Sequence, residues 1–118
     1  MIGYKKIGVY IGLSTVEAVA TLNILDDAKK VNPKGSNKWR CDKAIVTAIE
    51  TLDGNKEYRV GHSCICTAQG ITGCTYIVGH VVKPNYAFNS DDRIECAGGI
   101  HYFLTKQEAI DYCRETIY

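Results

Sequence analysis

Residues 95–116 read E-C-A-G-G-I-H-Y-F-L-T-K-Q-E-A-I-D-Y-C-R-E-T, and this stretch decides the fold because a loop, a strand and a helix follow one another in it. The glycine pair at 98–99 permits backbone conformations that other residues avoid. Residues 100–104 form a short aromatic and β-branched run, which is typical of a buried strand. Thr105 and Glu108 form a T-x-x-E capping box, so the sequence predicts that a helix begins at Thr105.

The predicted helix carries an apolar stripe. Ala109, Cys113 and Ile117 recur at intervals of four residues, and Ile110 lies beside them. A stripe of this kind lets a helix bury one face against a sheet. We therefore expect the C-terminal helix to pack on the strands that precede it.

The beginning of the chain reads mostly as strands. Residues 4–11 alternate weakly and predict a frayed strand that breaks at Gly8 and Gly12. Residues 18–25 alternate more regularly and predict a second strand. Residues 26–31 have acids first and lysines last, the order that suits a single helical turn.

The middle of the chain reads as two hairpins after a polar loop. Strands are predicted at 40–52, 57–60, 62–68 and 74–82, with turns at 53–55 and 69–73 and loops at 32–38 and 85–93. The D-G-N turn at 53–55 suits the positive backbone angles of a tight hairpin. Strands come first and one helix comes last. This order predicts one α+β domain over residues 1–118, with a mostly antiparallel sheet and a C-terminal α-helix packed on it.

Charge and hydropathy argue against several classes of protein. The chain has 14 Lys and Arg residues against 13 Asp and Glu residues, so no overall field attracts a nucleic-acid polymer or an anionic membrane. No apolar run approaches the roughly 20 residues that span a bilayer, and no signal-peptide core follows the first residues. We therefore expect a cytoplasmic protein with neither membrane nor nucleic-acid polymer as a partner.

Six cysteines occur in the chain, and we expect them to be thiols that pack as small hydrophobic groups. Zinc is the alternative for one set of residues. The set is His62, Cys64, Cys66, Cys74 and His80. Its Cys-x-Cys spacing is unfavourable, because structural zinc prefers two cysteines separated by about two to four residues on a tight turn. We predict no metal and no cofactor.

Several segments of the chain resemble a known family. They are Y-K-K at 4–6, D-D-A-K-K-V at 26–31, R-C-D-K-A-I-V at 40–46, L-D-G at 52–54 and D-D-R-I-E-C-A-G-G-I-H-Y-F-L-T at 91–105. The chain resembles small uncharacterised domains of bacteriophages, prophages and giant viruses, some of which follow pentapeptide repeats. The specific core is E-C-x-x-G-I-H-Y-F at 95–103, while residues 62–80 depart from the pattern. The resemblance implies a viral origin and a host-cell cytoplasmic location, and it assigns no catalytic residue.

No familiar catalytic motif stands out in the sequence. A P-loop, a paired-carboxylate motif and a dinucleotide fingerprint are all missing. A nucleophile pair of Cys96 and His101 would need a third residue to orient the imidazole, and a thiol and an imidazole in a packed strand and loop are more often structural. We predict no catalytic residue, and an enzyme of unrecognised type ranks third among the functional interpretations.

A binding site is the better functional prediction. The 98–99 glycines can form an anion-holding nest of backbone amides near the helix start. Guanidinium and imidazole groups contact phosphate, and aromatic rings stack on bases. The predicted ligand-binding residues are Arg93, His101, Gly98, Gly99, Arg40, Arg59, Phe88 and Tyr86. A structural role is the alternative for each of them.

These observations lead to two functional expectations. The first is a non-catalytic phage-type protein that binds and sequesters a phosphorylated small molecule, such as a cyclic nucleotide or an ADP-ribose-type immune signal, and so counters host defence. The alternative is a protein-interaction or virion-accessory module without a small-molecule ligand, in which exposed aromatic side chains serve as anchors. Because a small β-rich domain has sheet edges to cover, we also expect a homo-oligomer.

Overall fold

A long β-hairpin begins the chain. The computed structural model describes residues 1–67, 70–84, 87–94 and 98–112, with the backbone alone at 64–67 and 70–73. Strands β1 (Ile2–Ile11) and β2 (Ser14–Asn23) pair antiparallel over their whole lengths. Gly12 turns the chain with a positive φ of 61°, as predicted. The predicted break at Gly8 is wrong, because this residue pairs with β2 on one side and with β7 on the other.

The hairpin is extended on both sides into an antiparallel sheet of seven described strands. The remaining strands are β5 (Ala44–Thr51), β6 (Glu57–Tyr58), β7 (Val60–Thr67), β8 (Gly70–Ile77) and β9 (Val81–Val82). The order of the strands across the whole sheet is β6-β5-β2-β1-β7-β8, and β9 also pairs with β5. The hairpin predicted at 53–55 is confirmed, since it joins β5 to β6 and Gly54 has a φ of 76°.

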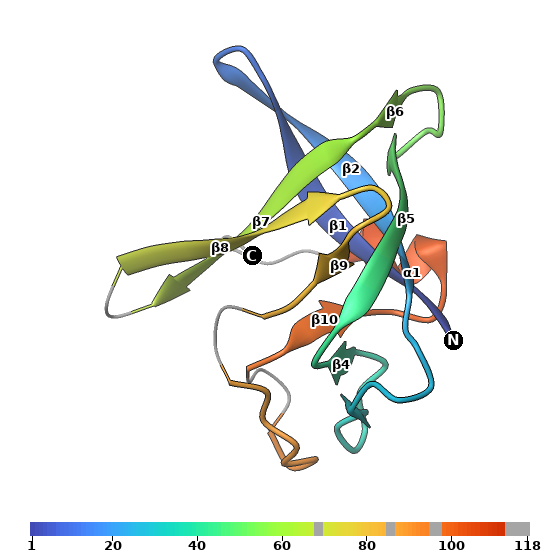
Figure 1. Cartoon of the computed structure of the whole chain (residues 1–118), viewed down its shortest axis with the longest axis vertical. Coiled ribbons are helices and arrows are strands. Elements are labelled where there is room, and N and C mark those ends of the chain that lie inside the picture. The colour runs from blue at the N-terminus through green and yellow to red at the C-terminus, as the bar shows by residue number, and fades with distance from the viewer. Residues whose placement is uncertain (68–69, 85–86, 95–97, 113–118) are drawn as a thin grey trace.

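Residues 57–67 close this sheet into an incomplete barrel. Tyr58 of β6 pairs with Ile49 of β5, and His62 of β7 pairs with Gly8 of β1. One nearly continuous segment is thus bonded to both edges of the β5-β2-β1 layer, and Figure 1 shows β6 running directly into β7. The closure leaves fewer exposed strand edges than an open sheet would have.

The second predicted hairpin forms, but with other boundaries. β7 and β8 pair from Val60↔Ile77 to Thr67↔Gly70, so residues 70–73 lie in a strand and not in the predicted turn. The predicted strand 74–82 is interrupted by a turn in which Gly79 has a φ of 87°. The Gly79 amide donates to the Val46 carbonyl at 2.7 Å. This contact explains the interruption, because it joins the turn to β5.

A small second sheet lies beside the first, with the order β10-β4-β3. It consists of β3 (Lys30–Val31), β4 (Trp39–Cys41) and β10 (Ile100–Tyr102). The helical turn predicted at 26–31 is wrong, because this segment ends in β3. Long-range hydrogen bonds decide the outcome: the Lys29 amide donates to Asp42 Oδ1 at 2.9 Å, and the Asp42 amide donates to the Lys29 carbonyl at 3.1 Å.

The chain between β4 and β5 moves from the small sheet to the large one. The sequence predicts one strand over residues 40–52, but residues 42–43 separate β4 from β5. A second link between the sheets joins the ends of the chain. The Tyr4 amide donates to the Phe103 carbonyl at 2.8 Å, and the Phe103 amide donates to the Tyr4 carbonyl at 2.9 Å. The start of β1 is therefore fixed to the end of β10.

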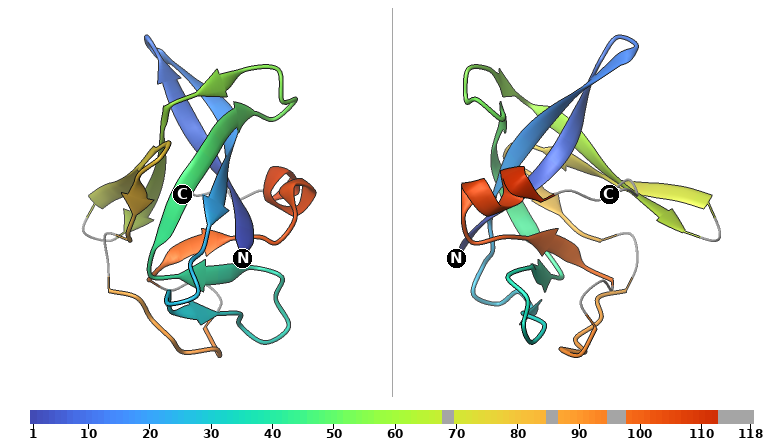
Figure 2. Two further views of the ribbon diagram at one scale, coloured as in Figure 1. Left: turned by 45° about the vertical axis from the view of Figure 1, so that its right-hand side comes forward. Right: turned by 180° about the vertical axis from the view of Figure 1, so that it is seen from behind.

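A short helix follows this link. Helix α1 (Lys106–Asp111) begins after the N-cap Thr105, whose hydroxyl oxygen accepts the Glu108 amide at 3.2 Å, as the capping box predicts. The helix is shorter than predicted, because Tyr112 already has an extended ψ of 118°. Cys113 and Ile117 of the predicted stripe lie outside the described residues. Seen from behind, α1 lies across β1 and β2 (Figure 2).

The hydrophobic core lies between the curved sheet and the small sheet. Its buried members include Ile7, Val9, Ala18, Ala20, Leu22, Ile24, Cys41, Val46, Ile49, Cys74, Tyr76, Ile100 and Tyr102. The expected α+β class is confirmed: the protein is a mostly antiparallel β domain with a C-terminal helix packed on the sheet. Among the described residues, no helix has the length and apolar character needed to cross a membrane.

Candidate anion-binding site

Three lysines and a histidine line a small pocket at the junction of the two sheets and the helix. The lining residues are Lys5, Lys6, Lys38, His101, Phe103 and Tyr112, and the cavity has a volume of about 30 Å³. A water molecule occupies roughly 10–15 Å³ of such space. The pocket therefore has room for one small tetrahedral anion and is too small for a nucleobase. We call it the basic pocket.

The basic pocket forms because distant parts of the sequence converge on it. Its lysine pair at 5–6 follows Tyr4, which is bonded to Phe103 through both backbone groups. Lys38 directly precedes β4, which pairs with β10. Tyr112 is the C-cap residue that follows α1, and α1 packs on β1. Four elements with separate positions in the sequence thus each contribute to the lining.

Lys38 is the most deeply buried lysine of the pocket, with 2 % of its surface exposed. Its Nζ donates to the Tyr112 hydroxyl at 3.0 Å and lies 5.1 Å from the centre of the Tyr112 ring. That ring lies 5.1 Å from the Phe103 ring. Burial of an ammonium group costs free energy unless hydrogen bonds and opposite charge compensate. An anion in the basic pocket would add such compensation.

Lys6 is held at the pocket by two contacts. Its Nζ donates to the Ile110 carbonyl of α1 at 3.0 Å and lies 3.5 Å from a carboxylate oxygen of Glu17. The Lys6 side chain is 25 % exposed, so water and solutes reach it. An ammonium group has three donors. Lys6 can therefore donate to a ligand while keeping both contacts.

His101 is the predicted ligand-binding residue that lines the basic pocket, and 7 % of its surface is exposed. It pairs with Arg40 in the register of β10 and β4. Directly opposed residues project from the same face of an antiparallel pair. Ile100 and Tyr102 lie in the core on the other face, as the alternation predicts.

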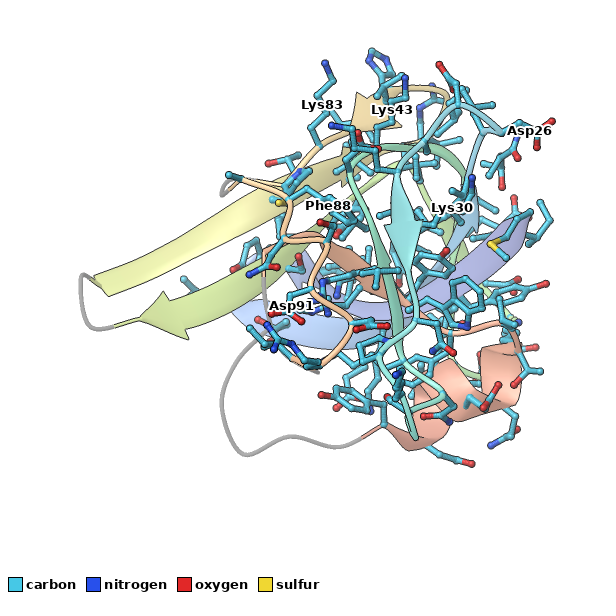
Figure 3. The ribbon with its side chains drawn as sticks, turned by 90° about the horizontal axis from the view of Figure 1, so that it is seen from below. Asp26, Lys30, Lys43, Lys83, Phe88 and Asp91 are labelled. Carbon is cyan, nitrogen blue, oxygen red and sulfur yellow. The ribbon has the colours of Figure 1, made fainter. Side chains whose placement is uncertain are left out.

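Arg40 is fully buried, and its guanidinium bonds to a loop of the chain itself. Nε donates to the Asn89 carbonyl at 2.8 Å, Nη1 to the Ile94 carbonyl at 2.7 Å, and Nη2 to the Asp91 carbonyl. These bonds fix residues 87–94, which cross the lower end of the molecule with Phe88 and Asp91 (Figure 3). The structure thus places Arg40 in an internal contact rather than in the lining of the basic pocket.

Arg93 projects from the same loop into solvent, with 82 % of its side chain exposed. Its guanidinium holds the Asp91 carboxylate through Nε to Oδ1 at 3.0 Å and Nη2 to Oδ2 at 2.9 Å. Hydrogen bonds from the Arg93 side chain and amide lower the pKa of Asp91 to about 2. Phe88 is half-buried on this loop. Tyr86, also predicted, lies outside the described residues.

The predicted glycine nest lies against β4. The Gly98 carbonyl accepts the Asn89 amide at 2.9 Å. Gly99 has a φ of 150°, and a Cβ at this position would lie 3.1 Å from Cβ of Arg40. Close packing is therefore one reason for a glycine here. The glycines belong to the environment of Arg40, and neither lines the basic pocket.

Arg59 lines a different and wider hollow of about 320 Å³. Its lining residues are Thr47, Ala48, Ile49, Glu57, Tyr58, Arg59 and Val78. The hollow lies along β5 where the register with β2 shifts between Thr21 and Leu22. The structure therefore distributes the described predicted residues over several places. His101 lies at the basic pocket and Arg59 at the hollow. Gly99 lies against the buried Arg40, and Phe88 and Arg93 lie on the loop that Arg40 holds.

Sequence reasoning missed the lysines of the basic pocket. Lys5 and Lys6 belong to the Y-K-K segment, and Lys38 ends a polar loop. No local pattern connects these positions, because the basic pocket depends on the pairing of Tyr4 with Phe103. The lysines and aromatic residues of the lining come together only when the strands are paired, so the sequence alone offered no signal for them.

The described side chains include no group of three or more His, Cys, Asp or Glu residues placed to hold a metal ion. The side chains of Cys64 and Cys66 are outside the described part, so the zinc alternative is left as a hypothesis. Cys41 and Cys74 are buried free thiols. Burial raises the pKa of the Cys41 thiol to about 12. Cys96, considered as a nucleophile, lies outside the described residues.

Comparison with known proteins gives one result. No match was found among curated proteins or among solved structures. A family model matches residues 1–109, which include Tyr4, Phe103 and the whole described lining of the basic pocket except Tyr112. By this match the chain belongs to DUF5758, a family of unknown function.

Proposed function

We propose that the protein binds and sequesters a phosphorylated small molecule at the basic pocket without converting it. The observation that supports this proposal is the convergence of Lys5, Lys6, Lys38 and His101 on one small cavity. Ammonium and imidazolium groups form the charge-assisted hydrogen bonds that hold phosphate oxygens. Sequestration requires affinity alone, and the cations and aromatic rings of the described lining are groups that can contribute to it.

The biological setting is part of the same proposal. The resemblance to phage and giant-virus domains makes nucleotide-type signals of host defence, both cyclic nucleotides and ADP-ribose-type molecules, the first ligands to examine. A protein that only retains such a signal would lower its free concentration in proportion to the amount of protein made. A pocket shared between subunits of a homo-oligomer would be compatible with this role.

The direct test is calorimetry and thermal unfolding with adenosine monophosphate, cyclic adenosine monophosphate, cyclic dinucleotides and ADP-ribose, followed by recovery of the ligand. We expect at least one of them to raise the melting temperature and to be recovered unchanged. Chemically altered ligand would identify an enzyme instead. If none of these compounds binds, the proposal fails for this ligand class.

A matched pair of variants locates the site. Lys6→Met removes a partly exposed ammonium of the basic pocket, and Lys56→Met removes an exposed ammonium from the turn between β5 and β6. Both change the net charge equally, so a general charge effect would weaken both variants alike. We expect Lys6→Met to lose affinity and Lys56→Met to keep it. Equal affinities of the two variants would place the ligand elsewhere.

We propose a protein-interaction module as the second candidate, because the tip of the first hairpin exposes large apolar side chains. Tyr10 is 57 % exposed, Ile11 47 % and Leu13 fully exposed. Exposed apolar residues gathered at one place are typical of protein contacts. The partner of such a surface would be found by copurification with the intact protein.

A further inference from the structure

We propose that the basic pocket binds a terminal phosphoryl group, as in a phosphate monoester or the last phosphate of a nucleotide, in preference to a phosphodiester. This inference rests on the proposed function and makes its ligand class narrower. Three properties of the pocket carry the inference: its size, its charge and the arrangement of its donors.

The size of the pocket suits a group with a single attachment. The cavity of about 30 Å³ holds a volume of about two to three waters, which is close to one tetrahedral oxyanion. A phosphate monoester has three terminal oxygens, and one ester bond attaches it to the rest of the ligand. A phosphodiester has carbon substituents on two of its oxygens. The mouth of so small a recess therefore accommodates one substituent more readily than two.

The charge of the pocket favours a dianion. Lys5, Lys6 and Lys38 line the pocket, and Glu17 lies 3.5 Å from the Lys6 ammonium and offsets part of its charge. A phosphate monoester carries a charge of about −1.5 to −2 at neutral pH, whereas a diester carries about one negative charge. Because Lys38 is almost wholly buried, the interaction with it is weakly screened by water. The second negative charge of a monoester therefore increases its affinity.

The donors approach the cavity from several elements. Lys6 comes from β1, where the Ile110 carbonyl and Glu17 hold its ammonium. Lys38 comes from the segment before β4, and its ammonium lies 3.0 Å from the Tyr112 hydroxyl oxygen. His101 comes from β10. Donors that come from three separate elements suit a group with three terminal oxygens better than a diester with two.

The experiment compares ligands that differ only at the phosphate. Binding of adenosine, adenosine 5′-monophosphate and 3′,5′-cyclic adenosine monophosphate is measured by calorimetry at one ionic strength, and inorganic phosphate is tested alone and as a competitor. We expect the monophosphate to bind at least about tenfold more tightly than the cyclic diester, the ratio for one favourable ionic contact. Inorganic phosphate should compete, and Lys6→Met should reduce the ratio while Lys56→Met preserves it.

The possible failures are distinguishable. If the cyclic diester binds within tenfold of the monophosphate, or more tightly, the inference about the terminal group is wrong and the proposed function stands. If inorganic phosphate and all phosphorylated ligands of both experiments fail to bind the folded protein, the proposed function and this inference fall together. If the monophosphate is preferred equally by wild type and Lys6→Met, the terminal phosphate is not bound in the basic pocket, and the inference is also overturned.

Discussion

Arg40 and His101 lie directly opposite each other in the small sheet, yet their side chains take part in different structures. Arg40 bonds to the carbonyls of the loop at 87–94, and His101 lines the basic pocket. One pair of strands therefore connects the internal scaffold of the protein with its candidate ligand site. A loss of the scaffold contact should be transmitted to the site through the backbone of β4 and β10.

Replacement of Arg40 by methionine should destabilise the protein strongly. The variant would leave three part-buried carbonyl groups without their guanidinium donor. Each hydrogen bond to a charged group contributes about 1.5–3 kcal/mol, and denaturant unfolding measures the loss of free energy. Arg40→Lys should also be destabilised, because one ammonium cannot reproduce the planar fork. Arg59→Met, on an exposed arginine, is the control and should change stability by about 0.5 kcal/mol or less.

Two glycine variants separate backbone strain from crowding. Gly35 and Gly99 both have a positive φ, but a Cβ would meet no atom within 4 Å at Gly35, whereas at Gly99 it would meet Arg40. Gly35→Ala should therefore cost about 1 kcal/mol from strain alone. Gly99→Ala should cost about 2–4 kcal/mol, because overpacking is added. Equal losses in chemical unfolding would contradict the close packing of the 98–99 segment on β4.

Asp91 predicts a pH dependence of stability. Its pKa in the folded protein is lowered from 3.8 to about 2, first by the hydrogen bond from the Arg93 side chain. A lowered folded pKa stabilises the protein above the unfolded pKa, and the stabilisation is lost as the pH falls through the folded value. The ion pair should therefore raise the melting temperature above about pH 4 and lose this effect toward about pH 2.

Arg93→Gln tests this pH dependence. Arg59→Gln is the control, because it removes the same amount of positive charge. The melting temperature of Arg93→Gln should fall below that of wild type near neutral pH and approach it toward about pH 2. Arg59→Gln should follow the wild-type curve. A constant difference between Arg93→Gln and wild type over the whole range would show that the Asp91 carboxylate is not the group responsible.

The buried cysteines should react slowly in the native protein. Cys41 is fully buried with a thiol pKa raised to about 12, and Cys74 lies in the core with its Sγ 3.5 Å from the Lys83 carbonyl. The thiolate is the reactive form. Iodoacetamide at about pH 8, near the ordinary thiol pKa, should label peptides with these residues only after denaturation. Labelling at equal rates before and after unfolding, measured by mass spectrometry, would exclude this packing.

Leu13→Ser tests whether the hairpin tip is a contact surface. The Leu13 side chain is fully exposed at the turn between β1 and β2, so its loss should change the free energy of unfolding by about 0.5 kcal/mol or less. If the tip binds a protein or a second copy, the variant should nevertheless reduce copurification or the sedimentation coefficient. Unchanged association in the variant would show that the hairpin tip is not the contact surface.

Local patterns in the sequence predicted those elements that short-range physics decides. The capping box of Thr105 and Glu108 located the helix start, and the D-G-N turn located a hairpin. Predictions failed where distant contacts compete with local preference. The segment 26–31 has the charge order of a helical turn, but Asp42 bonds to Lys29 and the segment ends in a strand.

The candidate site was predictable only in part for the same reason. His101 was identified through its own segment and does line the basic pocket. The lysines could not be identified, because β1 and the segment before β4 meet β10 only in the folded chain. Arg40 was selected as a phosphate ligand for its chemistry, and no sequence pattern indicated that three carbonyls of the loop at 87–94 surround it.

The backbone bonds between Tyr4 and Phe103 also have a consequence for synthesis in the cell. Tyr4 and Phe103 lie far apart in the sequence, so the ribosome must release the whole segment between them before this pairing forms. Folds that depend on contacts so distant along the chain fold slowly, in about milliseconds to seconds. Until then the apolar side of the first hairpin is exposed to other newly made chains. The amount of active protein should therefore depend on chaperones and on the rate of translation.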